Sequence, residues 1–491
     1  MTARDSLDQR RAGVLLHVTS LPGAGPCGDL GAEAFNFVNF LADCGVSVWQ
    51  MLPVGPPQGS ESPYQTSSAH AGSGRLIGLQ PLLQAGWLES IPEGDFDEAD
   101  KLSALRHAHR RFRQIADDRE QGALAAYVAD QRYWLDDYAL FRAISEERQA
   151  PWWEWPEGLR EREGKALNQA RDRLGPDLDY IRWEQFEFSR QWASLRAHAT
   201  RRGVLLFGDM PIFVAHDSAE VWARQRDFDL NQDGTLRVVA GVPPDYFSAT
   251  GQRWGNPLYR WDQLAANDYR FWIERVRTQF ALFDVIRIDH FRGFEAFWEI
   301  PGDAATAING NWVQAGGDAL FERLEREFGR LPLVAEDLGV ITDKVTALRR
   351  KYRMPGMKIL QFAFGGDPHN PYLPYRHSRD AVVYTGTHDN DTTLGWYQSL
   401  EDDERGRVDD YLGHSRESMP WPLIRCAFGS RANLAVVPMQ DLLALDGAHR
   451  MNVPGVTSGN WRWRFDWDQV DAELTLHLTH LVELYARAEP N

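Results

Sequence analysis

Short apolar runs rich in β-branched residues recur along this chain, and Gly, Pro or polar residues bound each of them. Runs of this kind are typical of strands that are buried on both faces of a parallel sheet. Between several of them, apolar residues recur every three or four positions, as in amphipathic helices, for example over 34–41, 320–328 and 345–352. Eight strands are predicted in this way, over 14–20, 46–54, 204–212, 283–289, 333–336, 357–364, 381–387 and 434–439.

The alternation of strands with helices predicts an α/β fold, a closed (β/α)8 TIM barrel, because eight such units are enough to close a parallel sheet. A barrel with inserted loops can exceed about 400 residues, so the 491 residues fit one barrel. The interval between the second and third strands is far longer than one crossover helix requires. We therefore expect a single barrel over 1–491, with an inserted, mostly helical subdomain over 57–202 and an inserted aromatic-rich loop region over 213–270.

The overall charge and the cysteine content narrow the choice of partners. A net charge of −17 argues against nucleic acid or an anionic membrane as a partner, so the substrate is expected to be uncharged. No apolar stretch reaches the roughly 18 residues of a membrane span, and the first residues lack a hydrophobic signal core. Cys27, Cys44 and Cys426 are too few and too scattered for a disulfide framework or a zinc site. These features predict a cytoplasmic protein with no cofactor.

Three acidic residues stand at or just beyond the ends of predicted strands, namely Asp289, Glu336 and Asp389. A buried strand has little room for a charge unless its end opens onto solvent or a site. In a (β/α)8 barrel the functional residues gather at the carboxyl ends of the strands. We therefore expect the three carboxylates to converge on one site.

The surroundings of two of these acids predict different protonation states. Arg287 lies two residues before Asp289, so both side chains face the same way and the guanidinium favours the ionised carboxylate. Glu336 follows an apolar run, where burial raises a carboxyl pKa. A charged nucleophile beside a neutral proton donor is what cleavage of a glycosidic bond requires. Either acid alone is equally well explained as part of an ion pair at a barrel rim.

Aromatic residues make up 12% of the chain, and many lie in loops rich in Gly and Pro. A flat apolar ring with a polar edge suits the face of a sugar ring. The segment over 241–261 is the richest, and we expect it to contact substrate, although a single Trp is more often part of a core.

Long motifs spread over the chain resemble those of the 4-α-glucanotransferases called amylomaltases or disproportionating enzymes, glycoside hydrolase family 77 of the α-amylase clan. One departure is AGSGR (71–75), where members of that family commonly have AGNP. The matching stretches are HVTSLPG (17–23), ESPYQ (61–65), FGDMPI (207–212), AGVPPDYFSATGQRWGNPLY (240–259), IRIDHFRGF (286–294), AEDLG (335–339), MKILQFAF (357–364), GTHDNDT (386–392), MNVPG (451–455) and GNWRWR (459–464).

The resemblance implies a retaining glucanotransferase whose partners are an α-1,4-glucan donor and a glucose or maltooligosaccharide acceptor. Asp289 would be the nucleophile, Glu336 the general acid/base, and Asp389 the carboxylate that holds the donor sugar. A mobile loop bearing Asp245, Tyr246 and Phe247 would cover the site. The other substrate-binding residues implied by the resemblance are Arg287, His388, Asp209, Ser62, Tyr64, Gln252, Trp254 and Asn460.

Three other readings of the sequence are open. A hydrolase of the same clan would share the chemistry up to the covalent intermediate. His290 and His388 beside the strand-end acids could belong to a metal-dependent barrel hydrolase, although Arg287 in the same cavity disfavours a cation. A non-catalytic glucan-binding protein would not need all three carboxylates.

The segment DFDLNQDG (227–234) resembles the start of a calcium loop, but Ala240 occupies the position of the required Glu, so we expect a hairpin turn.

Overall fold

The computed structural model describes residues 7–59, 61–244 and 248–488. Its central feature is a closed parallel barrel with the strand order β1-β12-β11-β10-β9-β6-β3-β2. All eight predicted strands contribute to this barrel, so the predicted (β/α)8 fold is confirmed. The barrel strands are β1 (Arg11–Leu15), β2 (Val48–Gln50), β3 (Leu205–Pro211), β6 (Val285–Asp289), β9 (Leu333–Ala335), β10 (Gly356–Ile359), β11 (Ala381–Tyr384) and β12 (Leu434–Pro438).

Four strands, β1, β2, β10 and β11, end three or more residues earlier than predicted, and the differences are largest in β1 and β10. The ladder of β1 with β12 ends at Leu15 opposite Pro438, and a 3-10 turn at Val18–Ser20 follows. Similarly, β10 ends at Ile359, opposite the last residue of β11, and a 3-10 turn follows it. Except for the exposed Phe362, the apolar residues over 16–20 and 360–364 are buried by packing outside the ladder, and a hydrophobicity pattern does not distinguish this burial from burial in a strand.

Helices cover the outside of the barrel at each predicted amphipathic segment. α1 (Ala32–Asp43) buries Ala34, Phe37, Val38 and Leu41, and α12 (Gly317–Phe328) and α13 (Asp343–Lys351) match the other two predictions. None of the described helices is both long and apolar enough to cross a membrane. The remaining barrel-side helices are α9 (Ala219–Ala223), α10 (Trp261–Ala266), α11 (Arg270–Leu282), α14 (Thr393–Ser399), α15 (Asp402–Tyr411), α16 (Trp421–Gly429), α17 (Met439–Leu442) and α18 (Ala472–Leu484).

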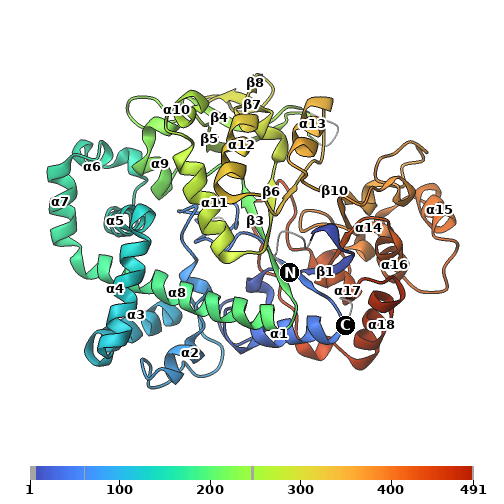
Figure 1. Ribbon diagram of the computed structural model, residues 1–491, viewed down its shortest axis with the longest axis horizontal. Helices are drawn as coiled ribbons and strands as arrows, with labels where there is room; N and C mark the ends of the chain where they lie inside the picture. Colours follow the sequence, from blue (N-terminus) through green and yellow to red (C-terminus); the bar gives the residue numbers. More distant parts are fainter. Residues whose placement is uncertain (1–6, 60, 245–247, 489–491) are drawn as a thin grey trace.

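The chain between β2 and β3 forms a group of helices at one side of the barrel (Figure 1). The long helix α8 (Gly175–Arg201) leads back to β3, and two of its glutamines hydrogen-bond the loop that follows β2. The Gln185 amide exchanges two hydrogen bonds with the backbone of Gly72, and the Gln191 amide does the same with Gly78. These helices are α2 (Leu79–Gln84), α3 (Glu98–Ile115), α4 (Asp118–Asp130), α5 (Arg132–Arg148), α6 (Glu157–Arg160), α7 (Gly164–Arg173) and α8 (Gly175–Arg201).

The AGSGR segment (71–75), which differs from the sequence common in the family, lies directly against α8. A Cβ atom at Gly72 would come within 2.1 Å of the Phe188 ring, and one at Gly74 within 2.7 Å of Glu184 Oε1. These two positions therefore have to be glycine for the loop to approach the helix this closely.

A second, four-stranded antiparallel sheet lies beside the barrel mouth, and the sequence did not predict it. Its order is β5-β4-β7-β8, with β4 (Val238–Val242), β5 (Gln252–Pro257), β7 (Ala296–Pro301) and β8 (Asn311–Gln314). The first two strands fall in the segment expected to be loops, because their Gly and Pro content weakens the strand signal. The predicted hairpin turn before β4 is confirmed by a bridge between Leu230 and Leu236.

Candidate active site

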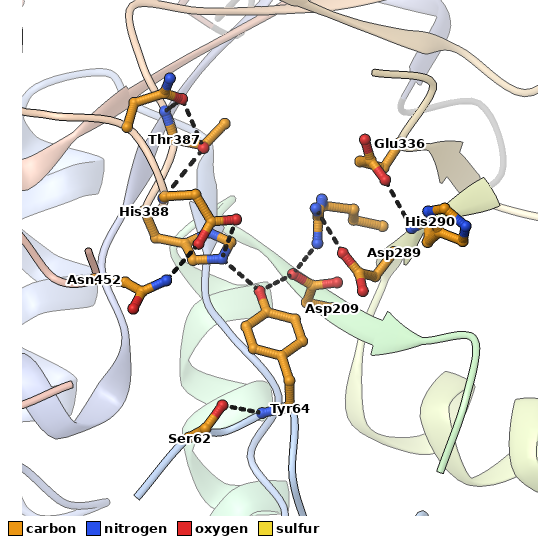
Figure 2. A network of polar contacts seen from close by, with 12 residues as sticks. Ser62, Tyr64, Asp209, Asp289, His290, Glu336, Thr387, His388 and Asn452 are labelled. Atoms are coloured by element: carbon orange, nitrogen blue, oxygen red, sulfur yellow. Dashed lines mark hydrogen bonds and ion pairs between the residues drawn. The ribbon is translucent and has the colours of Figure 1, made fainter. Parts of the chain in front are cut away.

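The carboxyl ends of β3, β6 and β9 bring the predicted acids together. In the β3–β6 ladder Asp209 lies opposite Arg287, and Pro211 lies opposite Asp289. Glu336 follows directly after β9, whose ladder pairs Ala335 with Ile288 of β6. Neighbouring parallel strands thus place these side chains at one end of the barrel, where Figure 2 shows them around a common space.

Arg287 joins two carboxylates. Its Nη1 atom lies 2.5 Å from Asp209 Oδ2 and its Nη2 atom lies 2.9 Å from Asp289 Oδ1. Burial by itself would lower the pKa of Arg287, but the charges of Asp209 and Asp289 raise it well above its usual value. The arginine is therefore a permanent cation that fixes the position of Asp289. The Asp289 side chain is still 30% exposed and accessible from the barrel mouth.

Asp209 links this pair to Tyr64 and His388. The Tyr64 hydroxyl donates a 2.8 Å hydrogen bond to Asp209 Oδ2 and lies 2.8 Å from His388 Nε2. The Tyr64 and His388 rings are stacked, with their planes 15° apart. The other oxygen, Asp209 Oδ1, is buried and has no hydrogen-bond partner in the described part of the chain. Such an atom is costly to leave unpaired, which suggests that it accepts a hydrogen bond from a ligand.

His388 connects Tyr64 to the third carboxylate. Its Nε2 atom is 3.3 Å from Asp389 Oδ2. Burial lowers the pKa of His388, which keeps the ring neutral. The Tyr64 hydroxyl donates its hydrogen bond to Asp209, so its oxygen is left as an acceptor near His388 Nε2, as is Asp389 Oδ2. We therefore infer that Nε2 carries the histidine proton.

Asp389 is held from the opposite side by a residue to which the sequence analysis gave no role. Asn452 Nδ2 donates a 2.7 Å hydrogen bond to Asp389 Oδ1, and Arg450 Nη2 donates one of 2.9 Å to the Asp389 carbonyl. Asn452 lies in the MNVPG stretch, which matched the family without indicating which residue mattered. The Asp389 side chain remains 48% exposed, so its unshared carboxylate surface faces solvent.

Glu336 has a different environment from Asp289. Its two oxygens accept backbone N–H groups from His290 at 2.7 Å and Leu338 at 3.1 Å. Burial raises the pKa of Glu336 to about 7, with Arg287 opposing the shift and Asp289 adding to it. Near neutral pH this carboxyl group is therefore present partly as the acid and can give a proton to a substrate.

His290 also builds the wall beside the acids. Its backbone is left-handed, with φ of 51°, which turns its N–H toward Glu336. Its ring packs edge to face against Trp254, with the ring centroids 4.8 Å apart. Trp254 Nε1 in turn donates a 3.0 Å hydrogen bond to Gln252 Oε1. Gln252 and Trp254 thus lie on the same side of the site as Glu336.

The remaining predicted residues are placed less directly. Ser62 Oγ accepts the Tyr64 N–H at 3.3 Å, which supports the loop that carries Tyr64. Asn460 hydrogen-bonds the backbone of Val453 and Val456, so its described contacts are with its own loop and not with the carboxylates. The predicted loop residues Asp245, Tyr246 and Phe247 lie outside the described residues. Among the residues that the structure describes, no three His, Cys, Asp or Glu side chains are grouped so that they could hold a metal ion.

Comparison with known proteins shows the family of this chain. The model of the glycoside hydrolase family 77, described as 4-alpha-glucanotransferase, matches residues 16–469. This chain belongs to that family. It is 47% identical to the 4-alpha-glucanotransferase of Thermus thermophilus over 97% of this chain and 99% of the relative. It is 42% identical to the chloroplastic/amyloplastic 4-alpha-glucanotransferase of Arabidopsis thaliana over 98% of this chain and 87% of the relative.

A solved structure shows the same architecture for this glucanotransferase family. The amylomaltase from Streptococcus agalactiae in complex with acarbose superposes with a TM-score of 0.94, at 33% identity, over 98% of this chain and 100% of that chain. The amylomaltase from Corynebacterium glutamicum has a TM-score of 0.78 at 19% identity, over 99% of this chain and 76% of that chain, which shows a common fold.

Next to the catalytic end of this family 77 barrel lies a cavity of about 430 Å³, which falls in the size range of small-molecule sites. Trp461 lines it, and the sequence analysis did not select this residue. The Trp461 ring centroid lies 6.0 Å from that of Tyr64 and 6.1 Å from that of His388. The only signal for Trp461 in the sequence was its place in the matching stretch GNWRWR.

Proposed function

We propose that this 4-alpha-glucanotransferase moves α-1,4-glucan segments between maltooligosaccharides by a retaining double displacement. One observation carries the mechanism: Arg287 holds Asp289 at 2.9 Å, while burial raises the pKa of the neighbouring Glu336 to about 7. A fixed nucleophilic carboxylate beside a carboxyl group that can donate a proton is what a retaining glycosidase mechanism needs.

In the first step, an oxygen of Asp289 attacks the anomeric carbon of the donor sugar. The bond from that carbon to the glycosidic oxygen breaks, and the proton of Glu336 passes to the departing oxygen. The product is a covalent glycosyl-enzyme and a shorter glucan with a new hydroxyl group. Arg287, paired with both Asp209 and Asp289, keeps the nucleophile oriented toward the donor sugar.

In the second step, Glu336 is a carboxylate and accepts the proton of an acceptor hydroxyl group. The acceptor oxygen attacks the anomeric carbon and displaces Asp289, so two inversions restore the original configuration. The N–H groups of His290 and Leu338 stabilise the charged form of Glu336 during this step. The carboxyl group thus alternates between acid and base within one turnover.

The other polar groups of the site hold the donor sugar. Asp389 and the unpartnered Asp209 Oδ1 provide acceptors for sugar hydroxyl groups, and His388 and Tyr64 fix their positions. We assign Gln252 and Trp254 to the acceptor side, because they adjoin His290 and Glu336. The remaining substrate-binding roles, which rest on the resemblance alone, belong to Ser62, Asn460, Asp245, Tyr246 and Phe247.

Two further assignments belong to this proposal. We regard residues 1–491 as one catalytic barrel, in which 57–202 form a helical subdomain and 213–270 an inserted region that includes strands. A cytoplasmic location is supported by the cysteines, all three of which are free.

Incubation with maltotriose tests the proposal directly. We expect glucose and a ladder of maltooligosaccharides longer than maltotriose, measured by chromatography of the products. If glucose and maltose accumulate and no longer chain forms, the enzyme is a hydrolase of the same clan, in which water and not a sugar resolves the intermediate.

A further inference from the structure

Exposed aromatic rings gather where the segment after β10 meets the end of α15. Tyr375 is 57% exposed, Tyr411 is 40% exposed and Phe362 is 38% exposed. Helix α15 lies on the opposite side of the molecule from helices α3 to α8 (Figure 1). Large exposed rings are unusual on a protein surface unless they bind something, and here three of them come from two neighbouring segments.

The two tyrosine rings are fixed in place by their own hydrogen bonds. The Tyr375 hydroxyl donates to the carbonyl of Pro368. The Tyr411 hydroxyl makes a hydrogen bond with the backbone of Tyr375, and the Tyr411 ring packs edge to face on Phe364 with centroids 5.4 Å apart. Rings held in this way lose little further conformational entropy when a ligand stacks on them.

A second aromatic contact lies on the same segment after β10. Phe362 packs edge to face on Tyr372, with centroids 5.5 Å apart. Burial raises the pKa of Tyr372 to about 12, and the charges of Asp337 and Glu336 add to the shift. The strand that precedes this segment, β10, lies between β9 and β11 in the barrel.

We propose that Tyr375 and Tyr411 bind an α-1,4-glucan chain that extends from the acceptor side of the active site past Glu336. The inference rests on the proposed function and specifies where long chains contact the enzyme. The ligand is a glucan because the rings are flat, are fixed and carry polar edges, which suits sugar faces. The segment that carries Tyr375 leaves the barrel after the carboxyl end of β10, next to β9, and Glu336 directly follows β9.

The test separates acceptor length from the chemistry of the donor. Maltosyl fluoride serves as the donor, because it forms the glycosyl-enzyme without a glucan leaving group, and glucose or maltoheptaose serves as the acceptor. In the double variant Tyr375→Ala/Tyr411→Ala we expect the KM for maltoheptaose to rise about tenfold. The kcat and the KM for glucose should stay within about twofold of wild type.

Two control variants identify the cause of any change. Leu476→Ala removes another highly exposed apolar side chain, which is 71% exposed on α18, and should leave the KM for both acceptors unchanged. Tyr375→Phe keeps the ring and should keep most of the affinity for maltoheptaose, as expected for stacking. Should the double variant unfold, Tyr375→Ala alone provides the test, because that side chain is the most exposed of the three.

An unchanged KM for maltoheptaose in a folded variant would overturn the proposal. So would an equal rise for glucose and maltoheptaose, because that result indicates a disturbed active site and not a distal contact. Failure of the proposed function has a different signature, since wild-type enzyme would then transfer no maltosyl groups to either acceptor.

Discussion

Two clusters in this protein combine an arginine, a buried carboxylate and a tyrosine. At the barrel mouth, Arg287 pairs with Asp209, which also accepts from Tyr64. In the helical insertion, Arg142 pairs with Glu184, which also accepts the Tyr180 hydroxyl at 2.8 Å. The carboxylates are almost equally buried, with side-chain exposures of 0% for Asp209 and 2% for Glu184.

The two clusters differ in what surrounds the carboxylate. Both oxygens of Glu184 are bonded by Arg142, and the backbone of Gly74 closes over them so tightly that no Cβ would fit. In contrast, Asp209 Oδ1 is unpartnered within the described residues, and Arg287 extends the cluster to the accessible Asp289. The same residue types thus join two segments of the chain in the Arg142–Glu184 cluster, whereas in the Arg287–Asp209 cluster they leave carboxylate oxygens available for a substrate. A buried ion pair by itself is therefore no evidence of catalysis.

The largest expected effect concerns Asp289 and Glu336, the two carboxyl groups to which we assign the chemistry. Asp289→Asn and Glu336→Gln should each lower kcat on maltotriose by at least about 10³-fold, because each removes a reacting group. Asp337→Asn is the matched control: this neighbouring acid pairs with Arg349 at 3.1 Å and accepts the Met357 N–H, so its loss should affect stability first. Near-normal turnover in either of the first two variants would contradict the assignment.

The two arginines should respond in opposite ways. Arg287→Met should lower kcat/KM by about 10²-fold or more, because it releases the nucleophile from its fixed position. Arg142→Met should lower the free energy of unfolding by about 3 kcal/mol, because it leaves Glu184 buried without its partner. Chemical denaturation and initial rates should be measured on both variants. If Arg142→Met reduced kcat of the folded enzyme as strongly as Arg287→Met does, the distinction between the clusters would be wrong.

The pH dependence should follow from Glu336. Its pKa is raised to about 7, so the proton that it must donate is lost as pH rises above that value. We expect kcat/KM for maltotriose to fall about tenfold per pH unit on the alkaline side. With maltosyl fluoride, whose leaving group needs no proton, formation of the glycosyl-enzyme should lack this alkaline decline. An alkaline decline of equal size for both donors would assign it to another group.

A smaller effect is expected at Asn452, which supports Asp389 with one 2.7 Å hydrogen bond. Asn452→Ala should lower kcat/KM by about tenfold, the value of roughly one hydrogen bond to a charged group. Asn460→Ala is a suitable comparison, because its described hydrogen bonds join only the backbone of its own loop. Equal losses in the two variants would show that loop order, and not the contact with Asp389, is responsible.

The smallest effect should come from removing divalent metal ions. Activity on maltotriose should be unchanged after dialysis against a chelator, because the proposed steps use only side chains of this chain. A loss of activity that an added divalent cation restores would favour the metal-dependent hydrolase instead.

The sequence by itself determined the barrel and the position of its acids. Strand patterns are local, since a short β-branched run between turn residues is favoured as a strand wherever it lies in a barrel. The two-residue spacing of Arg287 and Asp289 likewise fixes a common face before any tertiary contact forms. The resemblance to the family implied roles that spacing could not supply. Glu336 and Asp389 were indicated both by their positions at strand ends and by the family motifs.

Tertiary structure alone decided the contacts between distant segments. Asn452 reaches Asp389 across 63 positions of sequence, and Tyr64 reaches His388 across 324. The second sheet pairs β4 and β5, which precede β6 in the sequence, with β7 and β8, which follow it. No pattern within either pair of strands reveals that the two pairs join. Whether an arginine–carboxylate ion pair faces a binding site or is enclosed by protein depends on the residues that folding packs around it. Burial and hydrogen bonding are properties of the packed chain, so the sequence alone does not reveal them.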